Sequence, residues 1–578
     1  MRKTGRPFVG GRHYAVSSGH ALASMVGARM LERGGNAVDA GVAAGIALNV
    51  LQPDFVTFGG VAPIIIYLAA RREVVTISGV GWWPKAASIA YFREKAGGEI
   101  PPGVLRSLVP AAPDAWMTAL QHFGTLTLAE VLAPSIELAD RGFPTHNFQS
   151  TNLARWRDGF ERWPSTRAVF LPHGRPPAPG EPFVAKDLAR TRVRLVEGVV
   201  LHRGEGREGA IQAARDRFYR GDIAKTLVEF ARDQGGVLDR DDLAEFAVTL
   251  DPPVSVEYRG VRVYGCGPWC QGPALLQALA ILERFDLARV GHNTTDHLHL
   301  MAEALKLAFA DRERYCGDPR FVDVPLDRLL SKEHAARCAE MIRMDRAWEG
   351  LPPVRPPVGR RAPAAAGGGS GPVEGGAAGD GSSMDTSYAC AVDEAGNIFS
   401  ATPSDTTYDT PLVPGLGFGI SPRGMQSMLL DDHPNSLQPR KRPRLTPNPA
   451  LAFRDGEPCL AIGTPGGDVQ PQAMAQVMCN VVDFDMGPQE AVEAPRVATS
   501  AFPSTTWPQK YDPAGLKVEV GVEEEVRAAL AARGHAIAVS APADAWRMGG
   551  VCLIIRDPRT GLLLAGADPR RECYAVAW

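Results

Sequence analysis

One stretch near the middle of the chain divides the sequence into two unlike parts. The 30 residues from Pro352 to Gly381 contain six prolines and nine glycines, and their only large aliphatic side chains are Val354, Val358 and Val373. Such a segment buries too little apolar surface to offset the entropy that is lost when it becomes ordered. We therefore expect a linker or a long exposed loop over 352–383, so that the fold must be built from the two flanking parts of the 578-residue chain.

The part before this linker is rich in helical patterns. Small and apolar residues over 17–49 predict two helices that break at Gly34-Gly35, with Ser17 and Ser18 as caps of the first helix and Asn36 as cap of the second. Further helices are expected over 126–142 and 296–314. Apolar runs at 64–67 and 74–77 predict a buried hairpin, and 254–264 predicts two short strands that meet at Gly260.

The part after the linker is rich in strand patterns. Residues 386–392 and 398–402 flank the turn 393–397 and predict a hairpin whose first strand begins at Thr386. Short strands are also expected over 450–453, 460–463, 551–555 and 562–565, with helices over 474–482 and 523–533.

Charge and cysteine usage exclude several classes of protein. The 62 Lys and Arg residues nearly balance the 65 Asp and Glu residues, so the chain lacks the basic character of a nucleic-acid-binding protein. No uninterrupted apolar run is long enough to span a membrane, and no apolar region follows the basic N-terminus as it would in a secretory signal. The nine scattered cysteines are typical of free thiols in a reducing compartment. We expect a soluble, cytoplasmic protein without nucleic-acid or membrane partners.

Thr386 is the first candidate for a catalytic residue. A hydroxyl is a weak nucleophile unless a base lies beside it, and a threonine at a chain terminus can use its own α-amine as that base. Cleavage of the Asp385–Thr386 bond would create such a terminus at the point where the linker meets the strand. The alternative is an ordinary strand residue, because threonine favours strands.

Gly466 and Gly467 form the second candidate site. They follow a predicted strand, in the sequence Gly-Thr-Pro-Gly-Gly-Asp, where two backbone N–H groups can converge on an oxyanion. A Pro-Gly-Gly sequence is also common in plain turns. The histidines 292, 297 and 299 lie where a helix begins, and we interpret them as helix-start residues rather than metal ligands.

These two sites lie within a wider set of motifs that resembles the γ-glutamyltransferase family. Gly34-Gly35-Asn36-Ala37-Val38-Asp39-Ala40 is similar to that family's N-terminal helices. Motifs along nearly the whole chain follow in the family's order: 219–221, 301–304, 310–312, 317–319, the strand start at Thr386, 441–443, 463–467 and 566–571.

The resemblance implies a fold and a mechanism. The fold would be α+β, a four-layer αββα sandwich of the N-terminal-nucleophile hydrolases. The precursor would cut itself between Asp385 and Thr386 into a large chain 1–385 and a small chain 386–578, which together form one structural domain and a heterodimer, or a higher oligomer. Thr386 would attack a small-molecule amide, Ser404 would orient it, and the N–H groups of Gly466 and Gly467 would bind the oxyanion. No cofactor or metal is implied.

The sequence also departs from the family at the positions that recognise the γ-glutamyl group. Val80 stands where the family has a substrate-clamping arginine, and a valine cannot hold a carboxylate. Thr406 replaces an expected asparagine, Leu445-Thr446 replaces a pair of serines, and segment 421–427 lacks the acidic pair. Trp82 and Trp83 can line a changed acyl pocket or serve as plain core aromatics, and Arg423, Arg442 or Arg444 can rebuild a carboxylate site.

Three functions therefore remain open. The first is an amidohydrolase or acyltransferase with an acyl group other than γ-glutamyl, as in the oxamate amidohydrolase and cephalosporin acylase subgroups. The second is a true γ-glutamyl hydrolase or transferase acting on glutathione-like donors. The third is a non-catalytic homologue that binds a small ligand and never cleaves itself.

Overall fold

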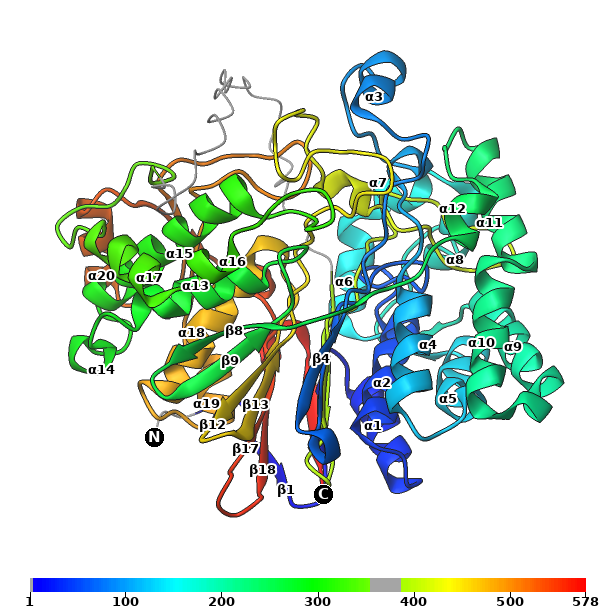
Figure 1. The fold of residues 1–578 in the computed structure, drawn as a ribbon, viewed down its shortest axis with the longest axis horizontal. Helices are drawn as coiled ribbons and strands as arrows, with labels where there is room; N and C mark the ends of the chain where they lie inside the picture. Colours follow the sequence, from blue (N-terminus) through cyan, green and yellow to red (C-terminus); the bar gives the residue numbers. More distant parts are fainter. Residues whose placement is uncertain (1–3, 354–385) are drawn as a thin grey trace.

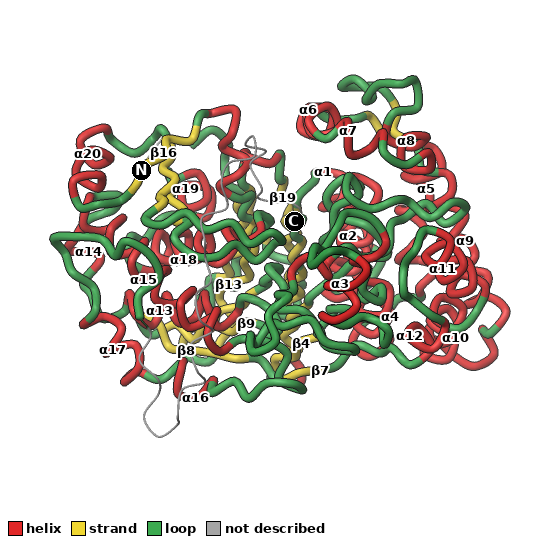
Figure 2. Tube along the Cα trace, turned by 90° about the horizontal axis from the view of Figure 1, so that it is seen from above, coloured by secondary structure: helices red, strands yellow, loops and turns green. Residues whose placement is uncertain are grey.

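Two seven-stranded sheets form the centre of the molecule. The computed structural model describes residues 4–353 and 386–578, so Asp385 and most of the predicted linker lie outside the described residues. The first sheet has the strand order β1-β18-β17-β13-β12-β9-β8, and the second has the order β19-β2-β10-β11-β3-β4-β7. Figure 2 shows the strands along the middle of the molecule with helices on both sides.

Both parts of the chain contribute to both sheets. The strands of the first sheet are β1 (Val9–Gly11), β8 (Val254–Tyr258), β9 (Val261–Gly265), β12 (Ala450–Arg454), β13 (Glu457–Gly463), β17 (Cys552–Arg556) and β18 (Leu563–Ala567). Those of the second sheet are β2 (Ala15–Ser18), β3 (Ile64–Leu68), β4 (Glu73–Ile77), β7 (Leu250–Asp251), β10 (Ala389–Val392), β11 (Ile398–Ala401) and β19 (Tyr574–Ala577). Smaller sheets are formed by β14 (Val497–Thr499), β15 (Gly515–Glu519) and β16 (Ala536–Ser540), and by β5 (Phe143–Pro144) and β6 (Pro182–Phe183).

Helices cover the outer face of each sheet (Figure 1). The second sheet packs against a helical layer that includes α1 (Ala21–Glu32), α2 (Ala37–Leu51), α4 (Ala112–Phe123), α5 (Leu128–Arg141), α9 (Lys186–Leu201) and α10 (Gly206–Tyr219). The first sheet packs against α13 (Gly272–Leu282), α15 (Thr295–Tyr315), α17 (Lys332–Glu340), α18 (Gln470–Val482) and α19 (Pro488–Glu493). The predicted fold class, a four-layer αββα sandwich, is confirmed.

The other helices lie around this sandwich. They are α3 (Ile89–Lys95), α6 (Asn147–Arg155), α7 (Arg157–Glu161), α8 (Pro164–Phe170), α11 (Asp222–Asp233), α12 (Arg240–Ala244), α14 (Leu287–Val290), α16 (Leu326–Leu329) and α20 (Glu524–Ala532).

A buried apolar layer joins the two sheets. It includes Ile65, Tyr388, Leu451, Ala461 and Ile554, each at most 1 % exposed. Alternate side chains of a strand face opposite sides of a sheet. Strands that are apolar on both faces, such as β3 with its run of three isoleucines, can therefore fill this layer and the helical interface together.

Most predicted elements are confirmed, and one assignment is wrong. Asn36 caps α2 in a capping box with Asp39, as its position before an apolar helix predicts. The predicted hairpins correspond to β3–β4, β8–β9 and β10–β11. Ser17 and Ser18 do not cap a helix. They lie in β2, and α1 begins after His20, whose side chain accepts the N–H of Leu22.

Candidate functional site

Thr386 lies three residues before β10, which begins at Ala389 rather than at Thr386 as predicted, where the chain enters the centre of the second sheet. Its side chain is 1 % exposed, and its φ of 89° is unusual for a β-branched residue. The backbone N–H donates to the carbonyl of Phe55 at 3.1 Å. The Oγ1 atom lies 2.6 Å from Oγ of Ser404, so the two hydroxyls share a hydrogen bond.

Three further residues hold these hydroxyls in place. Arg423 donates to Oγ of Ser404 and to the carboxylate of Asp405, and Ser421 donates to the same carboxylate at 2.5 Å. All of these side chains are buried. Arg423 can only donate, so the Ser404 oxygen accepts from it and keeps its own proton for a neighbour such as Thr386. We name Thr386, Ser404, Asp405 and Arg423 the Thr386 cluster.

Thr446 extends this cluster through Gln426, a residue that the sequence did not suggest. Arg423 donates to Oγ1 of Thr446 at 3.3 Å. Gln426 donates to the same hydroxyl and accepts the Thr446 N–H, both at 3.2 Å. Segment 421–427, which lacks the family's acidic pair, therefore contributes Arg423 and Gln426 to the same network.

Thr406 belongs to a second buried group, with Asp409 and Arg106. Its hydroxyl donates to Asp409 at 2.6 Å, and Arg106 pairs with the other carboxylate oxygen at 2.9 Å. Arg106 is 5 % exposed. No motif in the sequence marked this arginine, because its partner is 303 residues away along the chain.

Gly466 and Gly467 form the turn between β13 and α18. Their φ values of 128° and 57° lie in the region that favours glycine. The nearby Gly463 packs against the ring of Tyr388, where an added Cβ would lie 2.1 Å from a ring atom. This contact places the end of β13 beside the start of β10. Neither N–H group donates a hydrogen bond to another described residue.

Two of the proposed pocket residues, Val80 and Trp82, pack among apolar and aromatic side chains. Val80 is 1 % exposed and belongs to the apolar layer between the sheets. The Trp82 ring packs edge-on against Phe246, with the guanidinium groups of Arg320 and Arg440 over its face. The neighbouring Trp83 is fully buried against segment 421–427, because a Cβ on Gly424 would lie 2.3 Å from its ring and its Nε1–H donates to Ser427 at 2.8 Å.

Arg442 and Arg444 are held by other acids. Arg442 donates to Asp318 at 3.0 Å, and Arg444 donates to Glu313 at 2.7 Å. Burial alone would raise the pKa of Glu313, but Arg444 and Arg312 hold it well below its usual range. Of the three arginines named from the sequence, Arg423 is the one that the structure brings to Thr386.

Two buried groups in the described residues bring potential metal ligands together. One is His299, Glu303 and His535, and the other is Asp311, His334 and Cys338. In the second group Arg337 donates to Nδ1 of His334, so Nε2 carries the proton and donates to Asp311 at 2.6 Å. In the first, Lys306 pairs with Glu303 at 2.8 Å. Members of both groups are thus engaged by hydrogen bonds or ion pairs within the protein.

Within the described residues, no helix has the length and apolar character needed to cross a membrane.

The chain is similar along its whole length to known proteins. A family model described as gamma-glutamyltranspeptidase matches residues 23–578. The glutathione hydrolase-like YwrD proenzyme of Bacillus subtilis (strain 168) is 31% identical over 570 residues, covering 98% of each chain. The acylase ACY 1 proenzyme of Pseudomonas sp. (strain SE83) is 34% identical over 591 residues, covering 99% of this chain and 94% of the relative.

A solved structure has the same fold. The cephalosporin acylase from Bacillus halodurans superposes with a TM-score of 0.85 at 29% identity, covering 100% of this chain and 98% of the other. The chain therefore belongs to the γ-glutamyltranspeptidase family, and it is an enzyme of the hydrolase and acyltransferase kind that this family comprises.

Proposed function

We propose that this enzyme is a self-processing amidohydrolase or acyltransferase whose nucleophile is Thr386. The observation that carries the proposal is the contact of 2.6 Å between Oγ1 of Thr386 and Oγ of Ser404, in a group fixed by Arg423. A nucleophile needs a defined orientation before it can attack, and this buried network supplies one. Cleavage before Thr386 would produce chains 1–385 and 386–578, which would remain together as a heterodimer.

The α-amine of the new terminus would act as the base. An N-terminal amine has a pKa of about 7.7–8, so it is partly neutral at physiological pH. The Thr386 nitrogen already lies 3.1 Å from the Phe55 carbonyl, which would hold the amine after cleavage. Thr386 Oγ1 would attack the amide carbonyl, its proton would pass to the α-amine, and the α-ammonium would then protonate the leaving amine.

Gly466 and Gly467 would stabilise the tetrahedral intermediate. Their N–H groups follow a strand end that packs beside the start of β10, and they are not engaged by described residues. An oxyanion donor of this kind contributes about 3–4 kcal/mol to transition-state stabilisation. Water, or an acceptor amine, would then release the acyl group from Thr386.

We infer that the acyl group is small and is not γ-glutamyl. Val80 lies in the apolar layer rather than presenting a cation, and the segment 421–427 contributes Arg423 instead of an acidic pair. On this proposal Thr446, Gln426 and Trp83 would line the acyl side, because they contact one another or the segment that holds Arg423, and they would suit a planar or carboxylate-bearing acyl group of the oxamate kind.

One observation favours the second candidate, a γ-glutamyl hydrolase or transferase. Arg106 is buried beside Thr406 through their shared partner Asp409, so a guanidinium is present even though Val80 is not an arginine. One of the relatives is also named a glutathione hydrolase-like proenzyme. Release of 4-nitroaniline from a γ-glutamyl anilide would support this candidate and contradict a non-glutamyl acyl group.

Self-cleavage tests the nucleophile. Purified protein is expected to give two chains, with Thr386 as the first residue of the smaller one by mass spectrometry. Thr386→Ala should remain one chain of about the 61.9 kDa of the whole sequence. Thr402→Val is a matched control, because this threonine is also fully buried and its hydroxyl has no hydrogen-bond partner in the described residues.

Persistence of the wild-type protein as a single chain after prolonged incubation would contradict the proposal and favour a non-catalytic homologue. If the protein cleaves, a panel of amides assayed for released ammonia or amine identifies the acyl group. Fractionation of cells tests the expected cytoplasmic location separately.

A further inference from the structure

Two helices of the outer layer bring a carboxylate, an imidazole and a thiol together. Asp311 lies on α15, and His334 and Cys338 lie one helical turn apart on α17. Figure 1 shows α13, α15 and α17 next to one another outside the first sheet. One potential ligand atom of each side chain lies within 4.8 Å of the other two. We name these three residues the Asp311 cluster.

His334 joins the other two residues of the cluster through one atom. Its Nε2 lies 2.6 Å from Oδ2 of Asp311 and 3.5 Å from Sγ of Cys338. All three residues are at most 3 % exposed. The Oδ1 atom of Asp311 is buried and has no hydrogen-bond partner in the described residues. Because a buried carboxylate oxygen without a partner is costly, this oxygen indicates a ligand that the protein alone does not supply.

The spacing of the imidazole and the thiol fits a tetrahedral zinc site. Zn–N and Zn–S bonds of about 2.0 and 2.3 Å at a tetrahedral angle place the two ligand atoms about 3.5 Å apart. The distance between Nε2 of His334 and Sγ of Cys338 has this value. The contact of Nε2 with Oδ2 of Asp311 is a hydrogen bond and is shorter than the roughly 3.3 Å expected around zinc. Coordination through Oδ1 would leave Oδ2 for the amide of Gln277, which donates to it.

The charge of the Asp311 cluster suits a divalent cation. One carboxylate and one thiolate together offset two positive charges, and thiolate and imidazole are ligands that zinc prefers. Burial, followed by the charge of Asp311, raises the pKa of the Cys338 thiol to about 12. The thiol therefore keeps its proton unless a bound cation displaces it.

The other buried group of potential ligands lacks this balance of charge. It consists of His299, Glu303 and His535, and the ammonium of Lys306 lies 2.8 Å from the Glu303 carboxylate. A divalent cation at this group would meet a neutralised acid and a neighbouring positive charge. The group therefore serves as a control for the Asp311 cluster.

Arg337 holds His334 in the tautomer that opposes metal binding. Its guanidinium donates to Nδ1 at 3.2 Å, so the proton of the neutral imidazole is on Nε2. Coordination through Nε2 requires this proton on Nδ1, with an acceptor beside it. Because Arg337 is only partly buried and its side chain is long, the guanidinium can turn toward solvent when a metal binds.

We propose that the Asp311 cluster is a zinc site that ties α17 to α15. Asp311, Nε2 of His334 and Sγ of Cys338 are the ligands, and a water molecule takes the fourth position. On binding, the Zn–S bond forms as the S–H bond breaks, and that proton leaves to solvent. The imidazole proton moves from Nε2 to Nδ1, so His334 stays neutral. The site lies outside the Thr386 cluster and does not depend on the proposed reaction.

Cobalt substitution tests the zinc site through its absorption spectrum. The full protein, without a histidine tag, is treated with a chelator, dialysed and titrated with Co²⁺. A thiolate bound to Co²⁺ gives a charge-transfer band in the near ultraviolet, and one equivalent of Co²⁺ should produce it. One equivalent of Zn²⁺ should then abolish the band, because the d¹⁰ zinc ion replaces cobalt and has no such transition.

Four variants make the result specific. Cys338→Ser should lose the band and bind Zn²⁺ at least about 100-fold more weakly, because even changes outside the ligand shell cost about 10- to 100-fold. Arg337→Gln should bind Zn²⁺ about tenfold more tightly, since glutamine offers the Nδ1–H of His334 an acceptor in place of a donor. The controls are His535→Gln in the other group and Cys459→Ser, a partly exposed cysteine of β13. Both should keep the wild-type spectrum and affinity.

Absence of the band in wild-type protein, or an unchanged band in Cys338→Ser, would overturn the inference. Loss of the band in His535→Gln would also overturn it, since the metal would then lie in the other group. Weaker Zn²⁺ binding by Arg337→Gln would exclude Nε2 of His334 as a ligand. Matching far-ultraviolet circular dichroism of the variants shows that a lost band is not a lost fold.

Discussion

At the scale of single residues, the Ser404 hydroxyl is the most informative position to change. Ser404→Ala removes the hydroxyl that bonds Thr386 at 2.6 Å. We expect slower self-cleavage and a turnover lower by about 10- to 100-fold, because a hydrogen bond that orients a reacting group is worth about 1–3 kcal/mol. The measurements are the half-time of chain cleavage and kcat on an amide that the panel identifies.

Ser404→Thr is the matched control for this prediction, because it keeps the hydroxyl and adds one methyl group. Its cleavage half-time and kcat should stay within a few-fold of wild type. If the alanine and threonine variants behave alike, the hydroxyl does not orient Thr386.

Gly466 is the second residue with a specific expectation. Its φ of 128° strains any other residue, at a cost of about 1–3 kcal/mol. Gly466→Ala should therefore misplace the N–H donors of the turn and lower kcat by about 100-fold, with KM changed little. Gly487→Ala, where φ is −64° and nothing lies within 4 Å of the added Cβ, should have wild-type kinetics. If kcat is unchanged in Gly466→Ala, the N–H groups of this turn do not take part in catalysis.

At the scale of elements, the start of α1 links stability to pH. His20 caps the helix by accepting the Leu22 N–H at 3.1 Å, and burial, followed by the nearby His146, lowers its pKa to about 3. The unfolded chain takes up this proton near pH 6.5, whereas the folded protein resists it. The His20 contribution to stability is therefore complete above pH 6.5 and decreases as the pH falls toward 3.

His20→Asn keeps a good capping residue without the titration. Its stability relative to wild type should rise as the pH falls, by about 1.4 kcal/mol per pH unit below 6.5 at most. Urea unfolding at pH 7.5 and pH 5 measures this difference. If the unfolding free energies of wild type and His20→Asn change by the same amount between these pH values, His20 is not the residue that links stability to pH.

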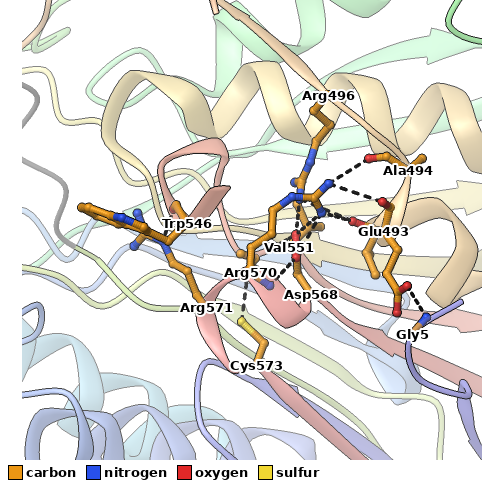
Figure 3. A network of polar contacts seen from close by, with 12 residues as sticks. Gly5, Glu493, Ala494, Arg496, Trp546, Val551, Asp568, Arg570, Arg571 and Cys573 are labelled. Carbon is orange, nitrogen blue, oxygen red and sulfur yellow. Dashed lines mark hydrogen bonds and ion pairs between the residues drawn. The ribbon is translucent and has the colours of Figure 1, made fainter. Parts of the chain in front are cut away.

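A buried ion network fixes the end of β18 (Figure 3). Asp568 pairs with Arg496 and with Arg570 at 3.2 Å, and Arg570 also pairs with Glu519 of β15 at 2.6 Å. Asp568→Asn leaves two buried cations with less compensation, so we expect a loss of about 3–5 kcal/mol in unfolding free energy. Glu457→Gln breaks an exposed pair with Arg72 and should cost less than about 1 kcal/mol, by the same urea titration. Similar losses in both variants would contradict this role of the network.

The elements also show what a sequence can and cannot predict. The helix after Asn36 and the hairpins β3–β4 and β10–β11 were predictable, because periodicity, caps and turns are local signals. Strand β2 was missed since its four residues pair with β10 and β19, which lie more than 350 residues further along the chain. The local sequence of residues 15–18 contains no signal that indicates these partner strands.

In the candidate site, too, local motifs located some residues and missed those that long-range contacts bring in. Thr386, Ser404 and the Gly466 turn were located through motifs, and their roles in catalysis stay predictions. Arg106 and Gln426 carry no motif, and the fold alone brings them to their partners. The sequence named Trp82 and Trp83 together as pocket residues, because no local signal tells two adjacent aromatic residues apart, and the fold places them in different surroundings.

At the scale of the whole molecule, the segments before and after the linker are interleaved. Strand β9 pairs with β12, β3 pairs with β11, and β2 pairs with β10, so both sheets contain strands from both proposed chains. After cleavage the chains 1–385 and 386–578 should elute together in native size-exclusion chromatography and separate under denaturing conditions. If the small chain elutes by itself from native protein, the pairing between strands does not hold the two chains together.

The position of β2 has one more consequence. This strand of four residues donates and accepts backbone hydrogen bonds on both edges, with β10 at the start of the small chain and β19 at its end. Both partners lie in the other proposed chain, while β2 itself lies in the large one. Amide hydrogen exchange over 15–18 therefore reports on the association of the two chains, since these N–H groups can meet solvent when the small chain withdraws from either edge.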